Sequence, residues 1–66
     1  MHKGTITELT ERASGFIKRV GIKECLFFHA DALVGVDFKE LRIGRKVLFK
    51  IVESKKGPYA TQVRVA

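Results

Sequence analysis

The chain has 66 residues, a net charge of +6 from 13 Lys and Arg against 7 Asp and Glu, and a single cysteine. This length predicts one small domain over residues 1–66. One cysteine excludes an internal disulfide and a Cys-rich zinc site, and it favours a reducing, cytoplasmic location. No apolar run approaches the roughly 18 residues of a membrane-spanning helix. The excess of cations favours a polyanionic partner, unless the basic surface only keeps the protein soluble.

Short apolar segments separated by turn residues predict β-strands almost throughout. The strands are expected at about residues 4–10, 14–19, 25–29, 46–53 and 59–65. Ile6 and Leu9 differ in parity, so a bulge or bend is expected between them if both face the core. Residues 54–58 contain Gly and Pro and predict the hairpin loop between the last two strands. A short helical turn is plausible at residues 30–32, and residues 19–24 form either a tight loop or extensions of the flanking strands.

The alternation of side chains separates core from surface in two strands. His29 is the polar member of the third strand, so the face that it shares with Phe27 is predicted to meet water. Leu26 and Phe28 then enter the core. Polar neighbours in the second strand place Phe16 on its outer face. A phase shift of one residue would instead make the two outer phenylalanines ordinary core side chains.

Two exposed rings on neighbouring strands, bordered by cations, are typical of a binding surface. The cations nearest to them in this scheme are Arg12, Lys18 and Lys56. Such a surface suits single-stranded nucleic acid, because unpaired bases stack on aromatic rings while Lys and Arg contact phosphates. No recognition helix for duplex DNA is evident.

Two segments carry a family resemblance. Residues 12–17 read Arg-Ala-Ser-Gly-Phe-Ile and residues 26–30 read Leu-Phe-Phe-His-Ala. They are similar to the Lys-Gly-Phe-Gly-Phe-Ile and Val-Phe-Val-His-Phe segments of the bacterial cold-shock proteins, and the likeness extends over essentially the whole chain. The resemblance implies an all-β fold, a five-stranded antiparallel OB-fold barrel of the cold-shock-domain type. It also implies binding of single-stranded RNA or DNA, often as an RNA chaperone.

The resemblance implies that four binding positions of the family survive here, and Tyr59 and nearby cations are further candidate contacts. The expected stacking residues are Phe16, Phe27, His29 and Phe38, with Tyr59 either as a further ring or as a packing residue beside Val63. The expected phosphate contacts are Arg12, Lys18, Lys39 and Lys56.

Three ring positions of the family are occupied differently here. Glu8 stands where the first strand of the family carries a Trp, Ser14 replaces the first Phe of the second-strand segment, and Ala30 replaces the aromatic residue after the His. Each stacked base is worth about 1–3 kcal/mol, so we expect weaker stacking and more reliance on basic charge. Alternatively, the altered face binds protein or a second copy of the chain. The protein would then be a weak homodimer rather than a monomer.

No catalytic or metal-binding constellation is evident. Cys25 and His29 lie four residues apart in a predicted strand, so about 13 Å would separate them along it. Two His and one Cys without ligand-like spacing give little indication of a metal site. We therefore expect no enzymatic activity, no metal, no cofactor, no small-molecule substrate and no membrane association.

Overall fold

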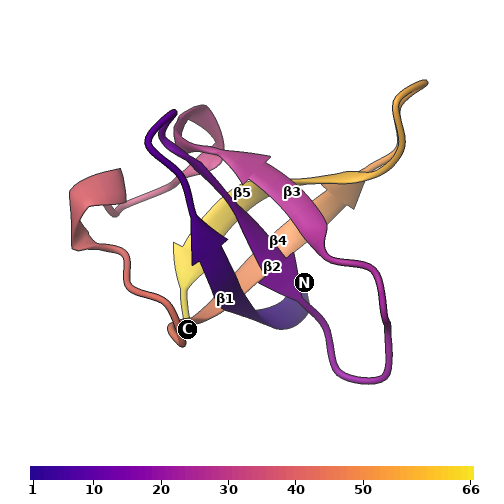
Figure 1. Ribbon diagram of the computed structural model, residues 1–66, viewed down its shortest axis with the longest axis horizontal. Coiled ribbons are helices and arrows are strands. Elements are labelled where there is room, and N and C mark those ends of the chain that lie inside the picture. Colours follow the sequence, from indigo (N-terminus) through magenta and orange to yellow (C-terminus); the bar gives the residue numbers. More distant parts are fainter.

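The computed structural model describes residues 1–66 and shows a closed five-stranded barrel (Figure 1). The strands are β1 (His2–Leu9), β2 (Ser14–Lys18), β3 (Leu26–His29), β4 (Lys46–Val52) and β5 (Tyr59–Val65). Two short 3-10 turns, η1 (Ala30–Ala32) and η2 (Phe38–Glu40), lie between β3 and β4. No helix is long and apolar enough to cross a membrane.

The strands follow the order β1-β2-β3-β5-β4 around the barrel. Every neighbouring pair is antiparallel except β3 and β5, which run parallel where the barrel closes between them. The predicted five-stranded barrel is confirmed, with this parallel pair as the departure from a purely antiparallel arrangement. The strand boundaries agree with the sequence expectations to within two residues, and β5 agrees at both ends.

Local features that the sequence left open are resolved by the structure. The β1–β2 register shifts between Ile6 and Glu8, which is the predicted bulge. The ambiguous segment after β2 is a loop, in which Val20 is fully exposed and Gly21 has a φ of 78°. The predicted helical turn at residues 30–32 is η1, whereas η2 was not expected.

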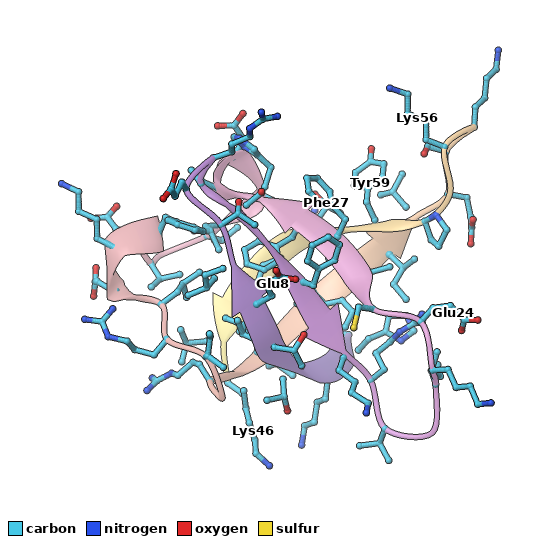
Figure 2. All side chains as sticks on the ribbon, viewed as in Figure 1. Glu8, Glu24, Phe27, Lys46, Lys56 and Tyr59 are labelled. Atoms are coloured by element: carbon cyan, nitrogen blue, oxygen red, sulfur yellow. The ribbon has the colours of Figure 1, made fainter.

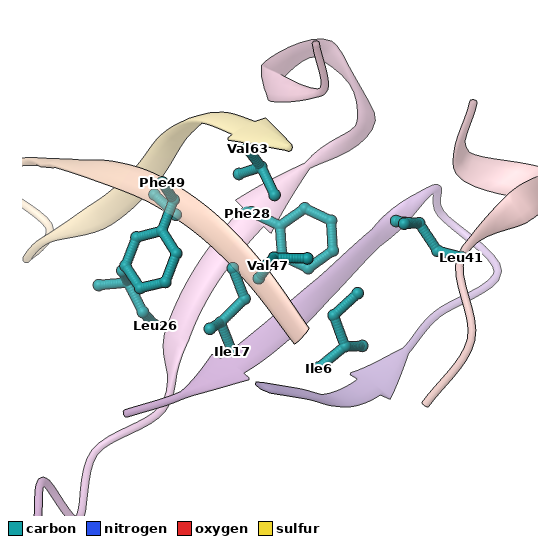
Figure 3. Packing of buried hydrophobic residues seen from close by; sticks show 9 residues of the cluster. Ile6, Ile17, Leu26, Phe28, Leu41, Val47, Phe49 and Val63 are labelled. Carbon is teal, nitrogen blue, oxygen red and sulfur yellow. The ribbon is translucent and has the colours of Figure 1, made fainter. Parts of the chain in front are cut away.

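Nine buried apolar side chains fill the barrel (Figure 3). They come from every strand and from the segment before β4: Ile6, Ile17, Leu26, Phe28, Leu41, Val47, Phe49, Ala60 and Val63. In β3 the burial alternates, with Leu26 and Phe28 inside and Phe27 and His29 exposed. The predicted phase of this strand is therefore confirmed, and the two phenylalanines of β3 lie on opposite faces of the sheet.

Gly15 in β2 allows β1 and β2 to pack closely. A Cβ atom at this position would lie 2.5 Å from the Glu8 carbonyl oxygen and 2.9 Å from Cε1 of Phe28. The first of these atoms belongs to the backbone and cannot swing aside, so a larger residue would force the strands apart. The close approach holds the end of β1 against the strand that carries Phe16.

Candidate nucleic-acid interface

The register of the barrel aligns four outer side chains in one line across four strands. Glu8 pairs with Phe16 across β1 and β2, and Phe16 pairs with Phe27 across β2 and β3. Phe27 pairs in turn with Tyr59 across the parallel β3–β5 junction. Paired residues point to the same side of a sheet, and neighbouring strands lie about 4.8 Å apart. We call Phe16, Phe27 and Tyr59 the ring row.

Within the row, Phe27 and Tyr59 are exposed, Phe16 is half-buried, and the rings of Phe16 and Phe27 pack against each other. The ring centroids of Phe16 and Phe27 lie 5.8 Å apart with an interplanar angle of 69°, an edge-to-face pair. Such a pair is favourable because the positive edge of one ring meets the negative face of the other. Phe27 is 43% exposed and Tyr59 38% exposed, and Figure 2 shows both on the same side of the barrel. Exposed rings in register offer adjacent places for flat, aromatic ligand groups.

A groove lies beside the ring row, between β3 with η1 and the β4–β5 loop. Its volume is about 700 Å³, within the range of about 300–1,000 Å³ that is common for ligand clefts. Side chains from both the rings and the loop line it, namely Phe27, His29, Asp31, Ala32, Ser54, Lys56, Gly57, Pro58, Tyr59, Ala60 and Thr61. The groove therefore joins aromatic rings to a cation at its rim.

Two hydrogen bonds fix the loop that carries Lys56. The Ser54 hydroxyl donates to the Gly57 carbonyl oxygen at 2.6 Å, and the Gly57 amide donates to the Ser54 carbonyl oxygen at 3.0 Å. Gly57 has a φ of 111°, a conformation that glycine adopts without strain. The loop is thus a defined turn, and it places the exposed Lys56 at the groove.

His29 is oriented by the start of η1. Its Nδ1 accepts a hydrogen bond from the Asp31 backbone amide at 3.1 Å and lies 3.4 Å from Asp31 Oδ2. The imidazole therefore lines the groove in a fixed orientation, as a flat polar group beside Phe27.

The structure brings together only part of the site that the sequence predicts. Phe16, Phe27, His29, Tyr59 and Lys56 meet at the ring row and its groove. Lys18 is exposed at the end of β2, two residues beyond Phe16 and on the same face. The other expected contacts lie elsewhere: Arg12 is exposed in the β1–β2 turn, Lys39 is exposed in η2, and Phe38 in η2 is half-buried against the core.

Sequence reasoning missed several groove residues. Asp31 and Thr61 line the groove, as do the loop residues Ser54 and Pro58. The only sequence signal for them was the loop composition, because the contact between β3 and β5 depends on a pairing of residues 32 positions apart. Ser14 is also buried rather than exposed on the outer face of β2. It is only 7% exposed, and its Oγ lies 2.7 Å from Thr10 Oγ1.

The remaining candidate for reactive chemistry is Cys25, which is exposed just before β3. Its Sγ lies 3.8 Å from Thr7 Oγ1, and no His or acidic residue joins it in a group. No cluster of three or more His, Cys, Asp or Glu side chains could hold a metal ion. The arrangement therefore supports stacking and charge contacts rather than bond-making chemistry.

Comparisons with known proteins agree with this geometry. The 'Cold-shock' DNA-binding domain family matches residues 2–66. A cold shock-like protein of Aquifex aeolicus is 38% identical over 64 residues, covering 96% of this chain and 91% of that protein. Cold shock-like protein CspLB of Listeria monocytogenes is 39% identical over 64 residues, covering 96% of each chain.

The solved structure of Drosophila Unr CSD456 is similar in fold, with a TM-score of 0.83 and 26% sequence identity. The match covers 98% of this chain but only 26% of that one, so this chain spans about a quarter of it. Cold-shock domains are, as a family, non-enzymatic modules that bind single-stranded nucleic acid. On the family match and these relatives together, this chain belongs to the cold-shock domain family.

Proposed function

We propose that this chain binds single-stranded RNA or DNA by stacking successive bases on the ring row. The observation that carries the proposal is the register Phe16, Phe27, Tyr59, which aligns three accessible rings one strand spacing apart. Every base has a π-face, and each stacked base contributes about 1–3 kcal/mol. A single strand would cross β2, β3 and β5, with its phosphates towards Lys18 and Lys56.

Charge supplies the other part of the binding free energy. The chain carries a net charge of +6, whereas three positions where the family has rings, Glu8, Ser14 and Ala30, offer no stacking surface here. Glu8 carries a carboxylate in place of a ring. Ser14 is buried, and its hydroxyl is hydrogen-bonded to the hydroxyl of Thr10. Compared with family members that keep those rings, the chain is therefore expected to rely less on stacking and more on cations, so a larger share of its binding free energy is lost as salt rises.

The proposal extends to an RNA-chaperone role. The fold has no α-helix to enter a major groove, and the ring row leaves bases unpaired while it holds them. A protein that binds unpaired segments stabilises them against hairpins by mass action. The chain is expected to lower the melting temperature of a weak RNA hairpin, with a shift that grows as the logarithm of protein concentration above the dissociation constant.

Two signals measured in one titration test the proposed function. Tyr59 is the single tyrosine and the chain has no tryptophan, so tyrosine emission reports on the ring row alone. A labelled thymidine heptamer should show a saturable rise in anisotropy and a parallel fall in Tyr59 emission. A rise in anisotropy with unchanged emission would mean contact through charge away from the ring row. Ile43→Ala, at an exposed position outside the groove, is the matched control and should bind like the parent.

Sedimentation distinguishes the proposed function from use of the same rings in self-association. Phe16 and Phe27 would be covered if two copies paired through this face. A monomer at all concentrations that binds the heptamer supports nucleic-acid binding. A dimer that fails to bind, and that Phe16→Ser converts to monomers, would contradict it.

A further inference from the structure

Glu8 occupies the fourth place in the line of outer residues, next to Phe16. In β1 the even-numbered Ile6 points into the barrel, so an unbroken strand would also turn Glu8 inward. The register shift between Ile6 and Glu8 leaves Thr7 as the extra residue and reverses the alternation. The Thr7 hydroxyl donates to the Phe16 carbonyl oxygen at 3.4 Å beside this bulge. The bulge thus places a carboxylate on the outer face, where Figure 2 shows it on the same side as Phe27.

The Glu8 carboxylate is exposed and makes no ion pair. The one basic–acidic side-chain contact within 4 Å in the molecule joins His29 to Asp31 and does not involve Glu8. An ionised carboxylate accepts hydrogen bonds and cannot donate them, and it repels phosphate. A strand stacked on the ring row is therefore favoured in a pose that turns a base edge, rather than its backbone, towards Glu8.

The four bases offer different edges to a carboxylate. The Watson–Crick edge of guanine presents two adjacent donors, N1–H and the N2 amino group, which match the two carboxylate oxygens. Cytosine and adenine each present one amino group beside an acceptor nitrogen. Thymine and uracil present one N3–H between two carbonyl oxygens, which face the carboxylate unfavourably. Charge-assisted bonds to paired donors are among the stronger hydrogen bonds, so guanine fits best.

We infer that Glu8 selects guanine for the nucleotide stacked on Phe16 and discriminates against thymine and uracil there. The inference rests on the proposed function, because the base must first stack on the ring row. It names a specificity-determining side chain in an otherwise sequence-tolerant site. The expected preference for guanine over thymine at this one place is about tenfold in affinity.

A set of thymidine heptamers with one central base replaced tests the inference by anisotropy. The parent protein should bind the guanine heptamer about tenfold tighter than the all-thymine one, with adenine and cytosine between. Adenine is the control for purine stacking, since it has a similar π-face but a single amino donor. Hypoxanthine keeps N1–H but lacks the N2 amino group. Its heptamer should therefore bind with an affinity closer to that of the adenine heptamer than to that of the guanine heptamer.

Glu8→Gln is the decisive variant because it removes the charge and keeps the shape. It should bind the all-thymine heptamer more tightly and reduce the guanine preference to less than about threefold. Glu24→Gln makes the same change of charge in the β2–β3 loop, far from Glu8 in Figure 2, and should leave the base preference unchanged. Thermal melting of both variants shows whether the fold is retained, as the exposure of both positions predicts.

Three outcomes would overturn the inference. Equal affinity for all heptamers, or tightest binding to thymine, removes the selectivity while the proposed function stands. A guanine preference that survives in folded Glu8→Gln assigns the selectivity to another group. No binding of any heptamer contradicts the proposed function itself, and the inference falls with it.

Discussion

Two faces of the same barrel differ in the side chains that they offer to a nucleic acid. The face of the ring row carries Phe16, Phe27 and Tyr59 with an acidic residue, Glu8, at its end. The face on β4, with the start of β1 and the end of β5, carries cations and no ring.

We call the second surface the β4 face and define it by Lys3, Lys46 and Arg64 around Leu48. Lys3 and Arg64 both pair with Leu48, one from each neighbouring strand, and all three cations are exposed. Lys46 points away from Phe27 and Tyr59 in Figure 2. None of the outer strand positions here is acidic.

The two faces differ in the range of their interactions, because rings act by direct contact and cations act through solvent. Stacking acts only where ring and base touch, so under the proposed function the ring row is expected to fix the bound pose. Charge acts through solvent over a Debye length of about 8–10 Å at physiological salt, which is short compared with the 21–27 Å extents of the molecule. Cations on the β4 face are therefore expected to accelerate encounter at low salt and to contribute little to the bound complex at physiological salt.

The largest expected effect comes from removing the core that supports both faces. Phe28→Ala deletes a ring with 0% exposure and should cost about 3–5 kcal/mol of folding free energy. Phe27→Ala, one residue earlier on the exposed side of β3, is the control and should leave most of the stability intact. Chemical denaturation followed by circular dichroism measures both. Equal losses would mean that Phe27 belongs to the core and that the ring row is not a surface.

The next effect isolates stacking. Phe27→Ala should weaken heptamer binding by about 1–3 kcal/mol, or roughly 5- to 150-fold, because it removes the central ring of the row. Phe27→Leu keeps the apolar bulk without the π-face and should recover only part of the loss. Anisotropy titrations measure the series. Unchanged affinity in folded Phe27→Ala would contradict base stacking on the ring row.

A smaller effect sharpens the role of the cation at the groove. Lys56→Ala should reduce affinity several-fold and lower the slope of log K against log salt by about 0.7, the value for one phosphate contact of a single strand. Lys55→Ala is the matched control, since Lys55 is the neighbouring exposed cation but does not line the groove. Equal effects of the two variants would show that only total charge matters.

The smallest effect is expected on the β4 face. Lys46→Ala combined with Arg64→Ala should change equilibrium affinity by less than about twofold near 0.15 M salt, while it slows association in low salt. Stopped-flow anisotropy at two salt concentrations measures both quantities. A loss as large as that of Lys56→Ala at physiological salt would place bound phosphates on the β4 face.

Alternation and turn chemistry were enough to predict the five strands, whereas the closed barrel was implied by the family resemblance. The polar His29 fixed the phase of β3, and the parity of Ile6 and Leu9 revealed the bulge. The short turn η2 was missed, although Asp37 and Glu40 have the spacing of a capping box, because the surrounding segment lacks any helical period.

The site was less predictable than the fold because it depends on pairing between distant segments. Phe16 and Phe27 follow from strand phase alone. The place of Tyr59 follows only from the parallel β3–β5 pairing, which no local pattern encodes. The sequence also could not predict that Phe38 and Lys39 lie outside the groove, because their positions depend on where η2 packs.

A salt series on the parent protein and Phe27→Ala tests base stacking on the ring row most directly. Heptamer affinity is measured from low salt to about 1 M, where the electrostatic part of binding is nearly abolished. At every salt concentration the parent should bind more tightly than Phe27→Ala by about the 1–3 kcal/mol of one stacked base, so that the two lines of log K against log salt run parallel. Lines that coincide for the two proteins, and that lose all binding at high salt, would contradict stacking and leave charge as the sole source of attraction.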